Sequence, residues 1–497
     1  MRMPSSRRWT SIAALILLVI PVIWQAVMVA TYARNIPFGD DYDLVYRFLT
    51  RARHHLIPNL TAQHNEHRLL VPRLIVYIMY KVQGIPDLIT LTLIGNMFLL
   101  GLLIIIIHQI RKSNLSWYFG VPVAYFIFSP LHGTQMIWVT GALQNFGVVF
   151  FAAAAFSLFE SSRPDRRVWG LIFGLMAAFT SLNGLLVPAI LLGRSLIGSP
   201  ERKRRPVWIW SSAGMAALCF GTYFINYTHP SHHPPLNWPM HHIPETVCHF
   251  LILMGGIAHQ PLASWILGCL LVLVTVFLLF RRPWRSAPFE FSMLLFLAGS
   301  GAMISLGRTR FGQGQGLSTR YAVLYLLVPV ILYILLLRTV ARQRTRYLIV
   351  ALTVILVAGA TIRNYGVCMD AVRRQSFDLD HGIHQWVVTG SAPATESGFR
   401  GNVSSIECFH SYTFKYNNVR SEESVIIFRR RFDGYENPGS YITYSGSCCR
   451  YGARCLRSES LCRCSESSSR RPVARWTGRS GRYPRQIPGR CTAAAAV

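Results

Sequence analysis

Apolar stretches long enough to cross a lipid bilayer recur along most of this chain. A membrane-spanning helix needs about 20 predominantly apolar residues. Of the 497 residues, 52% are hydrophobic and only 14% are charged. This composition excludes an ordinary soluble enzyme and predicts an all-α transmembrane protein, a polytopic helical bundle. The clearest runs cover residues 11–33, 86–108, 138–159, 207–226, 262–280, 289–307, 321–341 and 347–363.

The formal net charge of +29 would indicate nucleic-acid binding in a soluble protein. Here many basic residues lie between the apolar runs, and many others lie in the C-terminal segment. No recognisable nucleic-acid-reading module accompanies them. We therefore expect contacts with anionic membrane lipid and no nucleic acid partner.

The N-terminus resembles the basic start of a signal peptide, with arginines at positions 2, 7 and 8. The apolar run that follows, 11–33, is long enough to span the membrane, and no small-x-small cleavage site follows a short core. This pattern predicts an uncleaved anchor with its N-terminus inside.

The charges between apolar runs predict the orientation, because cytoplasmic loops are enriched in Lys and Arg. If all the basic clusters lie inside, the chain must cross the membrane an even number of times between successive clusters. This condition decides how two ambiguous stretches are read. Stretch 117–131 becomes one short pass, broken at Ser129-Pro130, and 168–197 becomes two short passes broken around 181–184, or a re-entrant hairpin. The prediction is about eleven spans, with the C-terminal tail outside. The clusters are Arg111-Lys112, Arg163–Arg167, Glu201–Arg205, Arg281–Arg285 and Arg342–Arg346.

Three loops, 34–85, 227–261 and 308–320, and the chain after 364 are then left outside. They hold the adjacent acids Asp40 and Asp41 and nearly all the histidines. Within 34–85, helical spacing predicts a helix from Asp43 to Arg53. Leu69–Val82 is apolar but too short and too basic to span, so it predicts an interfacial helix on the outer leaflet.

The sequence divides into a transmembrane catalytic domain (1–365), a small extracytoplasmic α/β-like region (366–440) and a tail (441–497). Val425–Phe428 and Tyr441–Tyr444 have strand-like composition. The tail is rich in Arg, Ser, Gly and Cys and lacks hydrophobic periodicity, which favours a disordered or frame-shifted segment. The alternative is a secreted disulfide-rich domain. The cysteines of the tail lack the spacing of a metal site.

The acidic pair is the first candidate for chemistry. Asp40 or Asp41 at the membrane face could act as a general base on a hydroxyl, or bind a divalent cation, Mg²⁺ or Mn²⁺. The alternative is a solvated acid that caps the helix starting near Asp43.

A polar cluster follows in the same loop. His64 and His67 have i,i+3 spacing, and Glu66 and Arg68 accompany them. We expect this cluster to bind substrate, with His67 and Arg68 holding a phosphate or hydroxyl groups near Asp41. The alternative is ordinary solvated loop residues.

Three arginines interleaved with glycines form the second strong feature, at residues 307–321. Arg308, Arg310 and Arg320 lie where the orientation disfavours positive charge. Arginine forks match phosphate oxygens, and a Gly-rich backbone can approach an anion closely. The spacing is not that of a nucleotide-binding P-loop. We therefore expect these residues, with Tyr321, to bind a lipid phosphate; the alternative is headgroup snorkelling.

Further polar residues lie in and around the predicted helix breaks, where polar side chains often line a cavity. The His- and Pro-rich segment 229–242 is expected to cover that cavity rather than to bind zinc. The second-tier candidates are His132, Gln135, Trp138, Gln144, Asn145 and Asn183.

An acidic pair in the first outer loop of a protein with about eleven helices resembles the GT-C superfamily of membrane glycosyltransferases. The chain also looks like a group of bacterial membrane proteins with Asp-Asp-Tyr/Trp and Asn-Glu-His-Arg elements. The resemblance covers the architecture of about residues 1–365. It implies sugar transfer at the outer face of the bacterial cytoplasmic membrane, from a polyprenyl-phosphate-linked sugar to a glycan, lipid or protein acceptor. The implied catalytic acid is Asp40 or Asp41, and we favour Asp41.

Two other classes of function stay open. A lipid-linked-glycan transporter, or a polymerase or ligase of the cell envelope, would share the arginine loop but need no acidic base. In a purely structural membrane protein, the acids would be helix caps.

Overall fold

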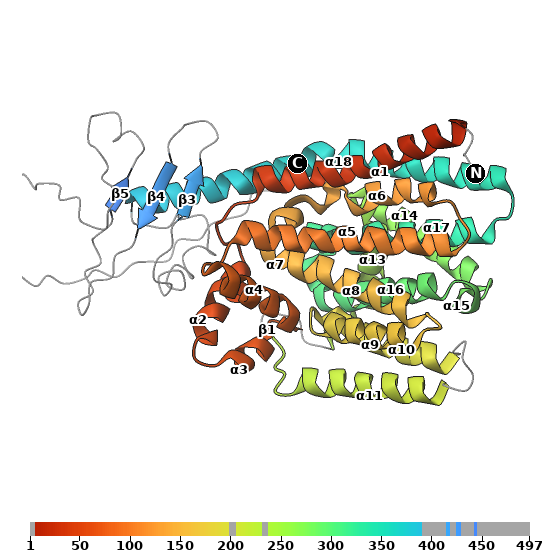
Figure 1. Cartoon of the computed structure of the whole chain (residues 1–497), viewed down its shortest axis with the longest axis horizontal. Helices are drawn as coiled ribbons and strands as arrows, with labels where there is room; N and C mark the ends of the chain where they lie inside the picture. Colours follow the sequence, from red (N-terminus) through yellow and green to blue (C-terminus); the bar gives the residue numbers. More distant parts are fainter. Residues whose placement is uncertain are drawn as a thin grey trace, which may run out of the picture. The chain divides into compact units, whose positions relative to one another are not determined.

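The structure is a computed structural model that describes residues 5–197, 205–230 and 237–389, together with three short strands farther along the chain (Figure 1). Within these residues eight helices are long and apolar enough to cross a membrane. Each coincides with one of the apolar runs of the sequence. This confirms an all-α, multi-pass membrane protein. The eight are Ser11–Tyr32, Leu88–Lys112, Val139–Phe159, Arg205–Phe224, Pro261–Leu279, Pro288–Phe311, Thr319–Thr339 and Gln343–Ile383.

Two of these helices form the centre of the bundle. The span Thr319–Thr339, which contains α17 (Ala322–Thr339), is 83% buried, and Val139–Phe159, which contains α8 (Gly147–Phe159), is 78% buried. By contrast α14 (Pro261–Leu279) is mostly exposed and apolar, as expected of a helix that faces lipid. Gly170 lets α9 (Pro164–Ala178) approach α8 closely, as small residues do in membrane bundles, because a Cβ there would lie only 2.9 Å from the Phe159 backbone nitrogen.

The two ambiguous stretches are broken where the sequence predicts. The helix α6 (Val121–Ile127) ends before Ser129 and Pro130, and a 3₁₀ turn, η5 (Leu182–Leu185), separates α9 from α10 (Leu186–Ile197). A helix of 15 residues is about 22 Å long, shorter than the hydrocarbon core of about 30 Å. These segments are too short to count as full spans, so the total of eleven stays a prediction.

The first loop folds into small elements: η1 (Tyr42–Arg47, a π-helix), α2 (Phe48–Ala52), α3 (Leu56–Thr61) and α4 (Leu70–Gln83). Between α3 and α4, the strands β1 (Gln63–His64) and β2 (His67–Arg68) form a hairpin with His64 opposite His67. Asn65 turns this hairpin at φ +50°, a conformation that Asn tolerates. Gly84 ends α4 at φ +77°.

The sequence analysis missed two helices. Residues 227–261 were expected to form an outer loop, but they include α12 (Trp238–His241) and α13 (Ile243–Met254). α13 packs against α14, and Gly268 makes this possible because a Cβ there would lie 1.9 Å from the Leu251 carbonyl oxygen. The other long elements are α1 (Ser5–Tyr32), α5 (Leu88–Lys112), α11 (Arg205–Phe224), α16 (Pro288–Arg308) and α18 (Gln343–Thr389).

The helix α18 runs unbroken from Gln343 to Thr389 and so crosses residue 365, where the sequence predicts the first domain boundary. Its second half packs beside the end of α1, where Arg34 Nε donates to both carboxylate oxygens of Asp380, at 2.9 and 3.0 Å. The expected strands are present as β4 (Ser424–Phe428) and β5 (Ile442–Tyr444), which form an antiparallel sheet with β3 (Phe414–Asn417). Of the tail (441–497), residue 441 and residues 445–497 lie outside the described residues.

Candidate functional site

One cavity of about 420 Å³ collects side chains from five separate parts of the chain. They come from the first loop, the segment 138–148, the break at 181–183, the segment 227–240 and the segment 303–324. The three loops expected on one side therefore meet at one end of the bundle. The polar residues of the lining are Asp40, His64, Asn65, Glu66, His67, Trp138, Thr140, Gln144, Asn145, Ser181, Asn183, Tyr227, His229, Arg308, Arg320 and Tyr321.

The β1–β2 hairpin presents His64, Glu66 and His67 to the cavity. Arg68 anchors the hairpin from behind: its side chain donates to the backbone carbonyls of Thr61, Tyr223 and Ile225. The Tyr223 hydroxyl in turn donates to the Glu66 carbonyl at 3.0 Å. Arg68 is thus buried beneath the hairpin and does not line the cavity.

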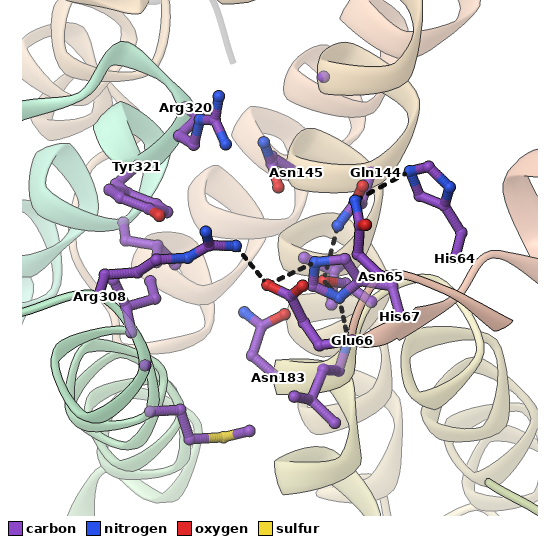
Figure 2. Close-up of a pocket in the computed structure, with 18 of the residues that line it drawn as sticks. His64, Asn65, Glu66, His67, Gln144, Asn145, Asn183, Arg308, Arg320 and Tyr321 are labelled. Atoms are coloured by element: carbon purple, nitrogen blue, oxygen red, sulfur yellow. Dashed lines mark hydrogen bonds and ion pairs between the residues drawn. The ribbon is translucent and has the colours of Figure 1, made fainter. Parts of the chain in front are cut away.

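Glu66 joins the two walls of the cavity. Arg308 donates to Glu66 Oε1 across 2.6 Å, and His67 Nε2 lies 3.4 Å from the same oxygen (Figure 2). The backbone N–H of Leu182 donates to His67 Nδ1 at 3.1 Å, so the ring proton belongs on Nε2, facing Glu66. Burial lowers the pKa of His67 to about 4. His67 is therefore a neutral donor at physiological pH.

Asp40 is the member of the acidic pair that faces the cavity. His64 Nε2 lies 3.5 Å from Asp40 Oδ1, and its Nδ1 lies 3.9 Å from Asp43 Oδ2. Burial opposes ionisation of Asp40, but the His64 hydrogen bond and the positive charge of Arg320 outweigh it and lower its pKa. Asp40 is therefore ionised at neutral pH.

Asp41 turns away from the cavity and is 2% exposed. Its Oδ1 accepts hydrogen bonds from the Thr140 backbone N–H at 2.8 Å and hydroxyl at 2.6 Å, and its Oδ2 accepts from the Phe38 N–H at 3.2 Å. Burial raises the pKa of Asp41 to about 7 in spite of these bonds. Thr140 lies in the first turn of the helix that begins at Val139, so Asp41 caps a helix far away in sequence.

Arg320 lies on the cavity wall opposite the β1–β2 hairpin, above Asn145 and beside Tyr321 (Figure 2). Its guanidinium carbon is 5.8 Å from the centre of the Trp138 ring. Trp138 is itself held by a hydrogen bond to the Phe38 carbonyl at 3.0 Å. Among the described residues no carboxylate forms an ion pair with Arg320, which leaves its forked donors available. Arg310 does not line the cavity.

The floor of the cavity is apolar and is built by α8, α16 and α17. A π-helical turn, η4 (Ala142–Phe146), lies between this floor and the polar walls and presents Gln144 and Asn145. Such π-turns occur often at functional sites. The arrangement gives an amphipathic cavity, charged at one end and apolar at the other. The apolar lining includes Val148, Met303, Ile304, Leu306, Val323 and Leu324.

The acidic pair does not fit the Mg²⁺ or Mn²⁺ site expected from the sequence. Three hydrogen bonds from protein groups occupy the two oxygens of Asp41, so it cannot share a cation with Asp40 without losing its cap. Among the described residues no three His, Cys, Asp or Glu side chains converge as metal ligands.

The second-tier candidates divide between lining and core. Trp138, Gln144, Asn145 and Asn183 line the cavity, as expected of residues at helix breaks. The other two, His132 and Gln135, are buried outside it. Sequence reasoning did not single out Tyr227. Asn65 belongs to the Asn-Glu-His-Arg element, and Met240 lies in the segment 229–242 that was expected to cover the cavity.

Comparisons with known proteins identify no relative: no family model, curated protein or solved structure matches the chain. The function is therefore argued from the chemistry of this cavity.

Proposed function

We propose that the protein is a membrane glycosyltransferase with a GT-C-like architecture, which transfers a sugar from a polyprenyl-phosphate donor to an envelope acceptor. The observation that carries the proposal is the single amphipathic cavity, with an ionised carboxylate on one wall, two arginines on the other and an apolar floor. A donor of this class needs all three, because its phosphate is anionic, its prenyl chain is apolar and its acceptor must lose a proton.

Arg320 and Arg308 would hold the donor phosphate. Arginine forks recognise phosphate bidentately, and the pair also stabilises the charge that grows on the leaving phosphate. Arg308 already binds Glu66 in this structure, so its approach to a phosphate would weaken or share that ion pair. The prenyl chain would lie against the apolar residues of α16 and α17, which open from the same cavity.

Asp40, and not Asp41, is the base that the geometry favours. The acceptor hydroxyl would attack the anomeric carbon and give its proton to Asp40, while the bond from that carbon to the phosphate oxygen breaks and the polyprenyl phosphate leaves. Attack opposite the leaving group inverts the anomeric centre. His64, 3.5 Å from Asp40, orients the carboxylate and can receive the proton afterwards.

The side of the membrane follows from the basic loops. The cavity would open at the outer face of the bacterial cytoplasmic membrane, with the N-terminus inside and the C-terminal region outside. A lipid-linked donor suits this side, because nucleotide sugars are confined to the cytoplasm. Single cysteines at Gly314 and Ser162, labelled with an impermeant maleimide, should react from outside and inside respectively; labelling from the same side would contradict the orientation.

The test is transfer of labelled sugar from polyprenyl phosphate in proteoliposomes, with donor binding measured in parallel. Asp40→Asn keeps size and hydrogen bonding but removes the base, so transfer should fall by about 10²–10⁴-fold while donor binding survives. Arg320→Ala should weaken donor binding by about tenfold or more, because a charge-assisted contact is lost. Arg310→Ala, which removes an arginine outside the cavity, is the control and should change neither.

The runner-up is a lipid-linked-glycan transporter, which the arginines alone would also serve. The same variants separate the two functions. A transporter would keep its flux in Asp40→Asn and lose it in Arg320→Ala. Full transfer activity in Asp40→Asn would refute the assignment of Asp40 as the base.

A further inference from the structure

A second hollow, with a volume of about 870 Å³, lies between α5, α8 and α9. It reaches the C-terminal end of α5 at Lys112. Figure 1 shows these three helices running side by side. Phe150 of α8 and Phe173 of α9 form its aromatic floor, with ring centroids 6.2 Å apart. Phe150 packs on Gly101 of α5, where a Cβ would lie only 2.5 Å from the ring. The hollow shares no lining residue with the candidate active site.

The polarity of this groove changes in order along α5. Gly101, Ile104, Ile105, His108 and Lys112 all line it. Their spacing places them on one face of the helix. The rise from the first to the last is about 16 Å, close to half the hydrocarbon core of a bilayer. The groove therefore runs about one leaflet deep along α5, from an apolar end at Gly101–Ile105, past His108, to a cation at Lys112.

The polar end of the groove carries an excess of positive charge. Lys112, Arg163 and Arg166 line it and are exposed. Of the nearby acids, Glu160 is held by Arg194 at 2.8 Å, and Asp165 lies 3.9 Å from Arg163. The helix α9 begins here at Pro164, and its N-terminus carries about half a positive charge. This cancels the half negative charge at the C-terminus of α5, so the side chains set the net charge.

A second basic depression continues this field on the far side of Lys112. Arg281, Arg338 and Arg346 line it together with Lys112. Glu290 neutralises one of them, Arg338, whose Nη1 donates to both Glu290 carboxylate oxygens at 2.7 and 2.8 Å. Lys112 thus stands between two positively charged hollows, and basic hollows between membrane helices bind anionic headgroups.

We propose that this groove binds one anionic glycerophospholipid. Its phosphodiester would contact Lys112, Arg163 and Arg166, and an acyl chain would lie along Ile104 and Ile105 over the aromatic floor. The charge excess selects a headgroup with net negative charge over a zwitterionic one, and the apolar wall selects a lipid over a free anion. The proposal rests on the membrane-spanning fold alone and stands whether or not the protein transfers sugar.

The experiment is native mass spectrometry of the full-length protein in detergent, titrated with dioleoyl-phosphatidylglycerol, dioleoyl-phosphatidylcholine or inorganic phosphate. Wild type should retain one phosphatidylglycerol more tightly than phosphatidylcholine. The double variant Lys112→Ala/Arg166→Ala should bind it about 30-fold more weakly, since each basic residue near an anionic headgroup contributes about fivefold. Arg344→Ala removes an exposed arginine of the same end that lines neither hollow, and it should bind as wild type.

A variant without charge change tests the acyl chain. Ile104→Trp fills the groove from an exposed position and should also weaken phosphatidylglycerol binding, even if the double variant does not fold. Three results would overturn the proposal. They are equal affinity for phosphatidylcholine, equal affinity in the double variant and Arg344→Ala, and displacement of phosphatidylglycerol by excess inorganic phosphate, which would indicate a simple anion site.

Discussion

The carboxylate of Asp41 accepts two hydrogen bonds from Thr140, 99 residues farther along the chain. This contact fixes the first loop onto the helical segment that supplies Trp138, Gln144 and Asn145 to the cavity. It also turns Asp41 away, so that its neighbour Asp40 faces the cavity. The acidic pair is therefore divided between two roles, one structural and one facing the site.

Asp41 should make the protein less stable as the pH rises through the range from about 4 to about 7. Its pKa is about 7 in the folded protein and 3.8 in an unfolded chain. Between these values the folded state holds a proton that the unfolded state releases, so stability falls as pH increases, by up to about 4 kcal/mol. The measurement is the unfolding temperature in detergent across this range.

The matched variant is Asp41→Asn, which cannot ionise and should lose this dependence. Thr140→Val removes the hydroxyl donor and should destabilise the wild type by about 1 kcal/mol but the Asn variant less. An identical pH profile in wild type and Asp41→Asn would contradict the assignment.

His67 should act in the opposite direction. Burial lowers its pKa from 6.5 to about 4, so between these values the unfolded chain binds the proton more strongly than the folded protein does. Its contribution, about 3 kcal/mol, is present above pH 6.5 and is lost as the pH falls toward 4. His67→Gln should flatten that acid limb of the unfolding-temperature profile. If the limb persists unchanged, His67 is not the group responsible.

Glu66 and Arg308 should show strong coupling in a double-mutant cycle. Removing the arginine alone leaves a mostly buried carboxylate without its main cation, at a cost of about 1–3 kcal/mol. Glu66→Gln/Arg308→Ala should cost less than Arg308→Ala, because the stranded charge is gone. Denaturation of all four proteins measures the coupling. Strictly additive effects would mean that the ion pair does not form.

Gly184 should be intolerant of any side chain. A Cβ at Gly184 would lie 1.8 Å from the Ala177 carbonyl oxygen, so Gly184→Ala must displace the turn that carries Asn183 into the cavity. We expect a loss of stability of about 1–3 kcal/mol. Gly193 lies in the next helix, α10, where an added Cβ would meet no neighbouring atom within 4 Å. Gly193→Ala should therefore stabilise the protein by about 0.5–1 kcal/mol. Comparable stability of the two variants would refute the close approach.

The helical fold was largely readable from the sequence because a bilayer imposes its length and polarity on each span separately. All eight long helices coincide with apolar runs, and the breaks before Pro130 and at 181–184 lie where polar or helix-breaking residues interrupt them. What local pattern could not give was the continuation of α18 past 365 and the presence of α13. Both depend on packing against distant elements, such as the Arg34–Asp380 pair.

The sequence by itself determined which polar residues lie together, since six of those that it singled out line one cavity: Asp40, His64, Glu66, His67, Arg308 and Arg320. It did not determine their roles. Asp41 has the same side chain as Asp40, and Arg68 the same as Arg308, yet Asp41 and Arg68 hold the loop in place and do not line the cavity. That division depends on which backbone groups lie nearby after folding. Here they are the Thr140 N–H, which donates to Asp41, and the Tyr223 carbonyl, which accepts from Arg68. Only the tertiary structure brings those groups within hydrogen-bonding distance.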